Sequence, residues 1–354
     1  MNLLLFNLAT DADDPILGFT TSWITALAER VENIDVITMR TGRIEVPENV
    51  RIYSVGKEKG YSEPRRVIEF YYILGKLLAN QHYDACFAHM MPLFAVMAAP
   101  ILRIKGIPIV LWYTHKSVTG MLRLATFLVS RVVTASKESF RISCSKVRVI
   151  GHGIDTNKFV PKENRTIKNQ FFTIITVGRL SPIKRVELLI EAVALLRDKK
   201  PEIFVCLNIV GGPVIKTDNA YETQLKSLVE EYDLKDRVIF NGSKSSTEVL
   251  PFYQNASCFV NLSETGSLDK AVLEAMSCEV PVVTNPVFSG VLGEDLTKMW
   301  VIDWDVEKLC DRLLLLASMS EQERYELGNK LRDIVVRQHS LNGLSMKLVN
   351  EFRN

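Results

Sequence analysis

The chain has 354 residues, of which 47% are hydrophobic and 24% charged, so a fibrous or disordered protein is excluded and two globular domains can be accommodated. The six cysteines form no C-x-x-C pair, which excludes a disulfide framework or a cysteine metal site and favours core thiols in a reducing compartment. The N-terminal segment lacks the basic and apolar regions of a signal peptide, and no stretch has the length and apolarity of a membrane-spanning helix.

Short β-branched segments alternate with longer amphipathic ones in the first half of the chain, a pattern typical of βα units and parallel sheets. We expect a helix over 65–80, where apolar residues recur at helical spacing. The expected strands cover residues 3–7, 35–38, 50–55, 84–88, 107–112, 131–135 and 147–150. An apolar run over 86–102 contains a histidine and two prolines, which indicates a strand, a turn and a helix.

A second series of βα units begins after the polar stretch 155–170, which is the best candidate for a linker. The expected strands cover residues 171–177, 203–210, 237–240, 258–262 and 280–284. Helices are expected over residues 185–198, 220–231, 246–254 and 269–278, and the chain becomes purely helical after about residue 305. Two series of this kind predict an α/β protein with two doubly wound domains.

Charge is distributed unevenly between the two halves. Residues 1–165 carry 21 Lys/Arg and 15 Asp/Glu, a net charge of +6, whereas the remainder carries 22 and 26, a net charge of −4. Nine of the basic residues lie in the segment 99–150, where Glu138 is the one acidic residue. Such a surface suits an anionic partner, such as a membrane, a phosphate or a nucleic acid, but a solvated basic surface explains the charge equally well.

The segment VGRLSPIKR, residues 177–185, predicts a phosphate site. A strand ends at Val177, Gly178 allows a tight turn, and a helix is expected to begin near Lys184. The free N–H groups at such a helix start favour an anion, and Arg179 and Lys184 add two positive charges in the same loop. The alternative is that both cations are solvated loop residues.

A second segment, NLSETGSLDKAVLEAMSCEVPVV, runs from a buried strand through a Gly/Ser loop into a helix that starts near Asp269. Glu274 lies on this helix among apolar neighbours. The sequence leaves open whether its carboxylate faces solvent or a cleft.

These two segments resemble the nucleotide-binding half of family 4 glycosyltransferases (glycosyl transferases group 1), and GHGIDTNKF, residues 151–159, resembles the segment at that family's domain junction. The resemblance implies the GT-B fold, with two Rossmann-like doubly wound domains facing across a cleft. It places an acceptor-binding domain at 1–160, a nucleotide-sugar-binding domain at 161–335, and a C-terminal helix at 336–354 that packs back towards the first domain.

The resemblance also implies roles for individual residues. Arg179 and Lys184 match the pair that holds the donor diphosphate and stabilises the leaving phosphate. Glu274 matches the carboxylate that binds the nucleotide ribose, and His115 matches a histidine near the donor sugar. Gly18 matches a glycine that lets the backbone approach the diphosphate.

One part of the donor site departs from the family pattern. Gly266 stands where the first glutamate of E-x7-E is expected, and Glu264 is out of register. The variant loop consists of Gly266, Ser267, Leu268, Asp269 and Lys270. We expect its N–H groups and Asp269 to contact the donor sugar, although Asp269 also suits the cap of the following helix.

The function that the resemblance implies is retaining transfer of a sugar from a UDP- or GDP-sugar to a glycan or lipid-linked acceptor, in the synthesis of cell-surface polysaccharide or glycoconjugate. We expect a cytoplasmic enzyme, with the inner face of the membrane as an alternative location, and neither a metal nor a nucleic-acid partner. Two D-x-D sequences, at 11–13 and 303–305, are interpreted as structural or capping. The rival functions are a nucleotide-sugar epimerase of the same fold and a non-catalytic nucleotide-binding subunit. No G-x-G-x-x-G follows the first strand of either domain, which disfavours a dinucleotide oxidoreductase.

Overall fold

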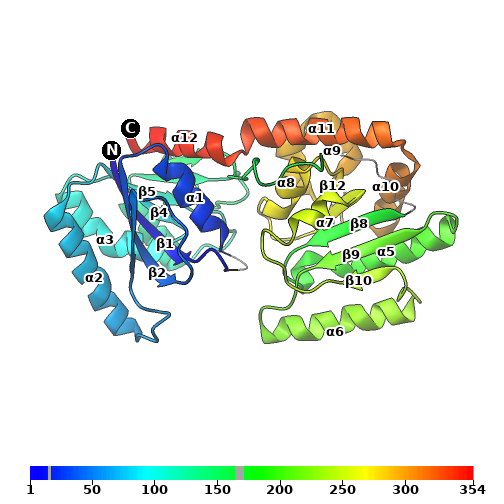
Figure 1. Ribbon diagram of the computed structural model, residues 1–354, viewed down its shortest axis with the longest axis horizontal. Coiled ribbons are helices and arrows are strands. Elements are labelled where there is room, and N and C mark those ends of the chain that lie inside the picture. Colours follow the sequence, from blue (N-terminus) through cyan, green and yellow to red (C-terminus); the bar gives the residue numbers. More distant parts are fainter. Residues whose placement is uncertain (15–16, 164–170, 354) are drawn as a thin grey trace. The chain divides into compact units, whose positions relative to one another are not determined.

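A computed structural model describes residues 1–14, 17–163 and 171–353 (Figure 1). The chain divides into two compact units. Unit 1 comprises Met1–Gly153 together with Leu341–Asn354, and unit 2 comprises Ile154–Ser340. The chain therefore crosses between the units twice, at 153–154 and at 340–341.

Unit 1 is built on a seven-stranded, wholly parallel sheet of order β3-β2-β1-β4-β5-β6-β7. Its strands are β1 (Asn2–Thr10), β2 (Asn33–Thr41), β3 (Val50–Ser54), β4 (Ala85–His89), β5 (Ile109–Trp112), β6 (Arg131–Thr134) and β7 (Val147–Val149). Its helices are α1 (Phe19–Ala28), α2 (Glu63–Asn80), α3 (Pro92–Ile104), α4 (Gly120–Leu128) and α12 (Leu341–Arg353). The strand order reverses direction between β1 and β4, as in a doubly wound fold.

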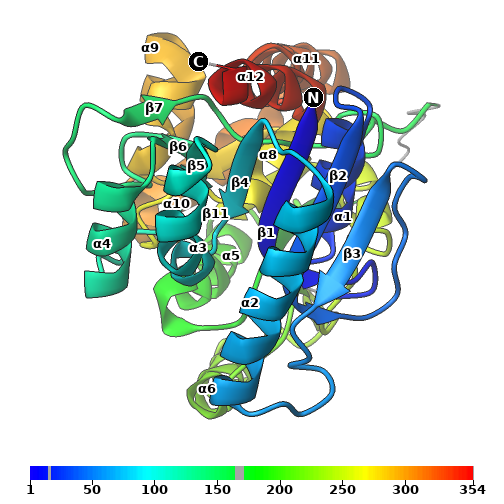
Figure 2. The ribbon, with the colours of Figure 1, turned by 90° about the vertical axis from the view of Figure 1, so that its left-hand side faces the viewer.

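The two faces of this sheet are covered by different helices. Because successive side chains of a strand point to opposite sides, neighbouring residues of one strand contact different helices. On β4, Cys86 and Ala88 join a buried cluster with α2, α3 and α4, which lie side by side in front of the sheet in Figure 2. Phe87 points the other way and packs on Phe352 of α12, with ring centroids 5.4 Å apart. Helix α12 also packs on α1, so the C-terminal helix completes the core of unit 1.

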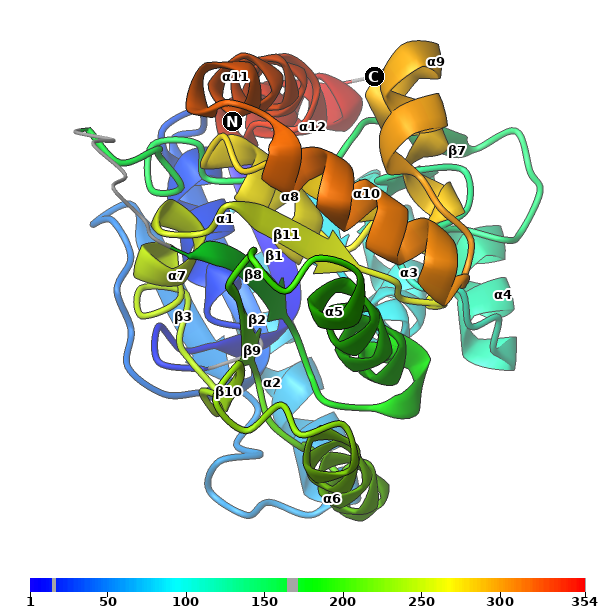
Figure 3. The same ribbon diagram turned by 90° about the vertical axis from the view of Figure 1, so that its right-hand side faces the viewer.

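Unit 2 contains a five-stranded parallel sheet of order β10-β9-β8-β11-β12 (Figure 3). Its strands are β8 (Phe172–Val177), β9 (Val205–Val210), β10 (Val238–Phe240), β11 (Cys258–Asn261) and β12 (Val282–Thr284). Its α-helices are α5 (Val186–Lys199), α6 (Lys216–Glu231), α7 (Leu250–Gln254), α8 (Lys270–Ser277), α9 (Ser289–Trp300), α10 (Val306–Ser318) and α11 (Glu321–Gln338). Two 3-10 turns, η1 (Pro182–Lys184) and η2 (Pro286–Phe288), follow β8 and β12. The order reverses between β8 and β11.

The predicted α/β class and the predicted strands are confirmed in both units, with boundaries that differ by a few residues. Helix α5 begins at Val186, slightly later than expected, because the Pro182–Lys184 turn precedes it. The helix expected over 246–254 is shorter, since α7 begins at Leu250.

The expected linker is packed in its first part. Phe159 is buried and stacks edge-on against Tyr253, and Arg332 donates to its carbonyl oxygen at 3.0 Å. Residues 164–170, the rest of that stretch, lie outside the described residues. The first crossing between the units therefore precedes the polar stretch.

No helix within the described ranges combines the length and the apolarity that crossing a bilayer requires.

Candidate active site

The two segments singled out in the sequence meet at one place in unit 2. The loop after β8 contains Gly178–Lys184, and the loop after β11 contains Leu262–Asp269. Because β8 and β11 are neighbours where the strand order reverses, both loops lie at the topological switch point. In doubly wound sheets, the crevice at the carboxyl ends of these strands is where ligands bind. The backbone links the loops directly, since the Glu264 N–H donates to the Ile183 carbonyl at 2.9 Å.

The first of these loops is held close to the end of β9 by glycines. Gly178 has φ of 150°, and a side chain on it would contact the aliphatic end of Lys184. Gly211 has φ of 141°, and a Cβ there would overlap the Gly178 carbonyl. The Gly178 N–H donates to Val210 O at 2.9 Å, which fixes the turn. Sequence reasoning missed Gly211, although a Gly-Gly pair directly after a buried strand indicates such a close approach.

Lys184 lies in a network of buried and half-buried polar side chains. Its ammonium forms an ion pair with Asp269, and the exposed fractions of the two side chains are 17% and 14%. Asp269 also accepts from Asn261 Nδ2 at 2.9 Å and caps α8 by accepting from the Ala271 N–H at 3.3 Å. Asn285 Nδ2 extends the network by donating to Asn261 Oδ1 at 3.3 Å.

The network controls the ionisation of Asp269. Burial alone would raise its pKa, but the Lys184 ammonium and the hydrogen bonds from Asn261 and Ala271 outweigh burial, so its pKa lies below the usual value. Asp269 thus takes the capping position that the sequence offered as the alternative, and it also pairs with the predicted phosphate-binding lysine. Sequence reasoning missed Asn261 and Asn285; an amide at the end of a buried strand was the available signal.

Glu274 is buried on α8, with 7% of the residue exposed, so its carboxylate does not face open solvent. Its carboxylate accepts from Tyr253 Oη at 3.1 Å and pairs with Lys270 Nζ, one turn earlier, at 2.9 Å. Burial and the Glu274 carboxylate raise the pKa of Tyr253 well above its usual value, which keeps the phenol a hydrogen-bond donor.

Tyr253 and Lys158 were not identified from the sequence. Burial and the Lys270 ammonium lower the pKa of Lys158, whose Nζ donates to Ser246 Oγ at 2.8 Å.

Each cation of these loops has a carboxylate neighbour. Lys184 pairs with Asp269, and Lys270 with Glu274. Arg179 Nε lies 3.6 Å from Asp218 Oδ2, and the Arg179 side chain is 44% exposed. Arg185 forms a 2.7 Å ion pair with Glu264. An anion entering this site therefore meets charges already ordered by protein partners. Glu264, out of register for the common motif, serves Arg185.

The remaining residues of the variant loop, Gly266, Ser267 and Leu268, connect β11 to α8. Gly266 has φ of 67°, a left-handed conformation that glycine adopts without strain. Leu268 is buried, which anchors the loop to the protein.

Two predicted site residues belong to unit 1. Gly18 ends the loop after β1, where a Cβ would lie 2.7 Å from the Asp14 carbonyl, so the loop itself requires a glycine. His115 is exposed after β5, and its Nδ1 accepts from the Ser117 N–H at 3.1 Å. His89 was missed: it ends β4 at the switch point of unit 1, where burial lowers its pKa to about 4.

Both D-x-D sequences have structural partners. Asp13 pairs with Arg43 at 2.7 Å, and Asp305 caps α10 by accepting from the Lys308 N–H at 3.0 Å. These contacts agree with the structural and capping roles expected for them.

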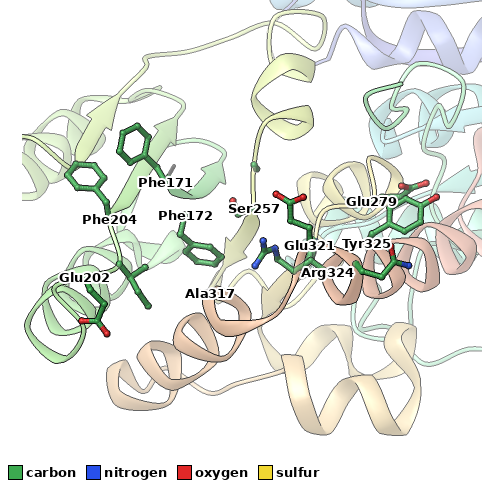
Figure 4. A pocket seen from close by; sticks show the side chains of 14 residues that line it. Phe171, Phe172, Glu202, Phe204, Ser257, Glu279, Ala317, Glu321, Arg324 and Tyr325 are labelled. Atoms are coloured by element: carbon green, nitrogen blue, oxygen red, sulfur yellow. The ribbon is translucent and has the colours of Figure 1, made fainter. Parts of the chain in front are cut away.

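One cavity of unit 2 lies away from this site. It opens at the opposite, amino-terminal edge of the same sheet, where Figure 4 shows Phe172, Phe204 and Tyr325 along its wall. None of the cations of the two loops lines it. The unit 2 residues that the sequence analysis predicted to bind the donor therefore lie at the carboxyl edge of the sheet and not in this cavity.

The chain has two doubly wound units, and the loops at the switch point of the second unit contain glycines and cations. This architecture is that of two-domain α/β proteins of the GT-B type. Residues 158–332 match the model of the family described as glycosyl transferases group 1. These residues lie within unit 2 and make up just under half of the chain, so unit 2 contains a domain of this family.

Curated relatives carry related names. Mannosylfructose-phosphate synthase of Agrobacterium fabrum is 27% identical over 153 residues, 41% of this chain and 34% of that protein. A phosphatidylinositol N-acetylglucosaminyltransferase subunit of Homo sapiens is 25% identical over 300 residues, 74% of this chain and 60% of that protein. D-inositol 3-phosphate glycosyltransferase of Arthrobacter sp. is 26% identical over 165 residues, 43% and 38% of the two chains. The chain thus spans roughly a third to three fifths of these relatives' lengths.

Solved structures share the whole fold. Anabaena Alr3699/HepE in complex with UDP superposes with a TM-score of 0.78 at 17% identity, covering 99% of each chain. Sucrose-phosphate synthase of Thermosynechococcus elongatus gives a TM-score of 0.78 at 17% identity, covering 100% of this chain and 98% of that one. At this identity the likeness establishes the fold, and the predicted GT-B architecture is confirmed.

Proposed function

We propose that the chain transfers a sugar from a UDP- or GDP-sugar to a glycan or lipid-linked acceptor, with retention at the anomeric carbon. The observation that carries this proposal is the position of Lys184 and Arg179. Both lie at the switch point of unit 2, in a loop whose close packing requires glycine, next to the start of α5. Family membership and the HepE complexes with UDP and with UDP-glucose support a nucleotide-sugar donor.

The donor diphosphate would lie against the loop after β8, where Lys184 and Arg179 balance the charge that develops as the sugar leaves. Two side-chain cations can fill the role that a metal ion fills elsewhere, so we propose a reaction without a metal. Glu274, already ordered by Lys270 and Tyr253, would accept hydrogen bonds from the ribose hydroxyls. The loop Gly266–Lys270 would contact the sugar, and His115 would act near the donor sugar.

In the proposed step, the bond between the anomeric carbon and the diphosphate oxygen breaks, and a bond to the acceptor oxygen forms on the same face of the sugar. The acceptor hydroxyl gives its proton to a donor phosphate oxygen, and the nucleoside diphosphate leaves. Retention is proposed because the family that the two segments resemble transfers sugars with retention. A same-face route is proposed because none of the carboxylates assigned to the site has the role of a nucleophile. We place the enzyme in the cytoplasm, in the synthesis of cell-surface polysaccharide or glycoconjugate.

The proposal is tested first by thermal unfolding with a panel of sugar nucleotides, because a ligand that binds the folded state raises the apparent stability. The stabilising donor is then incubated with candidate acceptors. We expect Lys184→Ala to lower turnover about a hundredfold, the scale of losing one donor to a developing charge. Lys330→Ala, which removes an exposed lysine from α11, serves as the matched control.

The rival functions give different results in the same assay. Interconversion of the donor without any acceptor would identify an epimerase and overturn transfer. Binding without hydrolysis or transfer would identify a non-catalytic subunit. Inversion at the anomeric carbon of the product, measured by NMR coupling constants, would overturn retention while leaving transfer intact.

A further inference from the structure

Helix α4 of unit 1 is apolar on its outer side as well as on its inner side. Leu122 and Ala125 face the core, whereas Met121, Leu124 and Phe127 are exposed to 40%, 46% and 75%. These three residues follow one another at a spacing of three, so they lie along one side of the helix. Arg123 is the one charged residue of α4, and an exposed apolar side of this kind is typical of a helix covered by protein or by lipid. No described segment of unit 1 covers this side, since its three apolar side chains are exposed.

The neighbouring helices continue this apolar surface. Figure 2 shows α2, α3 and α4 in one layer over the same face of the sheet. Ile68 and Tyr72, one turn apart on α2, are exposed to 70% and 66%, and Ile104 at the end of α3 is exposed to 87%. We call the exposed side chains of these helices the outer helical face; its apolar members are Ile68, Tyr72, Ile104, Met121, Leu124 and Phe127.

The charge on this face has one sign over α3 and α4. Residues 85–137 contain six Lys/Arg and no Asp or Glu. Arg103, Lys105 and Arg123 are exposed, and no carboxylate of the described residues forms an ion pair with any of them. Exposed apolar side chains flanked by unpaired cations are complementary to a surface that is both apolar and anionic.

A groove between α3 and α4 adds a specific feature. Its volume is about 270 Å³, and its wall combines the cations Arg103 and Lys146 with the apolar Ile107 and Phe127. The Lys146 ammonium is held at the end of α4 by the carbonyls of Phe127 and Val129, at 2.7 and 2.8 Å. A third carbonyl, that of Thr126 at 3.2 Å, also accepts from Lys146, so this ammonium contributes positive charge rather than a free donor. The exposed Arg103 guanidinium beside apolar walls suits a phosphate ester that carries a hydrocarbon chain.

We infer that the outer helical face docks onto a bilayer containing anionic phospholipid, with α4 at the interface and the groove against a lipid phosphate. A second copy of the chain is disfavoured as the occupant of the α4 region, because a two-fold contact centred on α4 would bring α3 and α4 of both copies, which lack acidic residues, against each other. The inference rests on the proposed function in one respect, since docking would bring the enzyme to a lipid-linked acceptor.

The experiment is co-sedimentation of the full chain with vesicles of phosphatidylcholine alone and of phosphatidylcholine mixed with phosphatidylglycerol. We expect binding to the anionic vesicles that weakens as salt rises. The double variant Leu124→Ser/Phe127→Ser should bind about tenfold more weakly or worse, because it removes apolar side chains that would enter the interface. Arg103→Gln and Arg123→Gln should each weaken binding about fivefold.

The matched controls are Val336→Ser and Lys330→Gln on α11 of unit 2, which should bind as the unchanged protein does; Val336 is 42% exposed. Lack of binding by the unchanged protein at low salt, or equal binding by all variants, would overturn the inference. So would a loss of self-association in the Leu124→Ser/Phe127→Ser protein without vesicles, which would assign the face to a second copy. Donor binding and turnover with a water-soluble acceptor are measured in parallel. Normal turnover without vesicle binding refutes docking alone, and vesicle binding without turnover refutes the proposed function alone.

Discussion

Replacement of Glu274 by glutamine tests the proposed ribose contact directly. Glutamine has nearly the same shape as glutamate. It keeps an oxygen that can accept from the Tyr253 hydroxyl, which lies 3.1 Å from Glu274 Oε2 in the unchanged protein. It loses the negative charge that pairs with Lys270 at 2.9 Å in a residue that is 7% exposed. A hydrogen bond to a charged group contributes about 1.5–3 kcal/mol, so we expect nucleoside diphosphate to bind roughly 10–150-fold more weakly.

The decisive assay is a double-mutant cycle between the protein and its ligand. Calorimetric titration compares the nucleoside diphosphate with its 2′-deoxy and 3′-deoxy analogues, in the unchanged protein and in Glu274→Gln. The unchanged protein should discriminate against at least one deoxy analogue, and the variant should lose most of that discrimination. The coupling isolates the ribose contact from any general effect on the fold.

Glu264→Gln is the matched control, because its carboxylate lies in the same region but pairs with Arg185 at 2.7 Å. Its discrimination against deoxy analogues should equal that of the unchanged protein. Thermal unfolding checks that Glu274→Gln still folds. If Glu274→Gln discriminates among the analogues as well as the unchanged protein does, the assignment of this carboxylate to the ribose is refuted.

Three further changes test other parts of the structure. The folded-state pKa of Asp269 is lowered, so its pairing with Lys184 stabilises unit 2 above the unfolded pKa of about 3.9, and this contribution disappears as pH falls through the folded pKa. Lys184→Met should therefore show a smaller loss of unfolding free energy on acidification, and an unchanged pH profile in denaturant titrations would contradict the pairing. Gly211→Ala should displace the Gly178 turn and weaken nucleotide binding more than tenfold in titrations, which corresponds to a loss of more than roughly 1.4 kcal/mol of binding free energy. Unaltered affinity would mean that the close approach is dispensable. Phe70→Ala should cost unit 1 about 3–5 kcal/mol in chemical unfolding while nucleotide binding by unit 2 persists, and a loss below 1 kcal/mol would show that the core repacks.

The fold was largely predictable because its signals are local. Most strands of both sheets are short runs of apolar or β-branched residues, and a buried parallel strand needs little more than that to be recognised. The loop that we propose to bind the donor phosphates was equally visible, since Gly178, Arg179 and Lys184 lie within seven residues of one another. The first crossing between the units was placed too late, because Phe159 supplies the buried contact that the polar composition around it conceals.

What the sequence did not show depends on pairs of residues that are far apart in the chain. Asp269 lies 85 residues after Lys184, and their pairing follows from the adjacency of β8 and β11. Glu264 is visibly out of register in the sequence, but its partner Arg185 emerged only when the two loops were brought together. Gly211 acts through a backbone contact with Gly178, for which no side-chain pattern exists.

The double crossing between the units has a consequence for the order in which they are completed. Unit 1 needs α12, whose Phe352 packs on Phe87 and whose Glu351 pairs with Arg131 at 2.7 Å. Because α12 follows Ser340 in the chain, the ribosome makes it after the whole of unit 2. Unit 2 is therefore the first to have all of its residues, although it is encoded second. During that interval the α12-facing side of the first sheet lacks its cover, so the growing chain exposes Phe87 to chaperones or to a neighbouring chain until α12 has been synthesised.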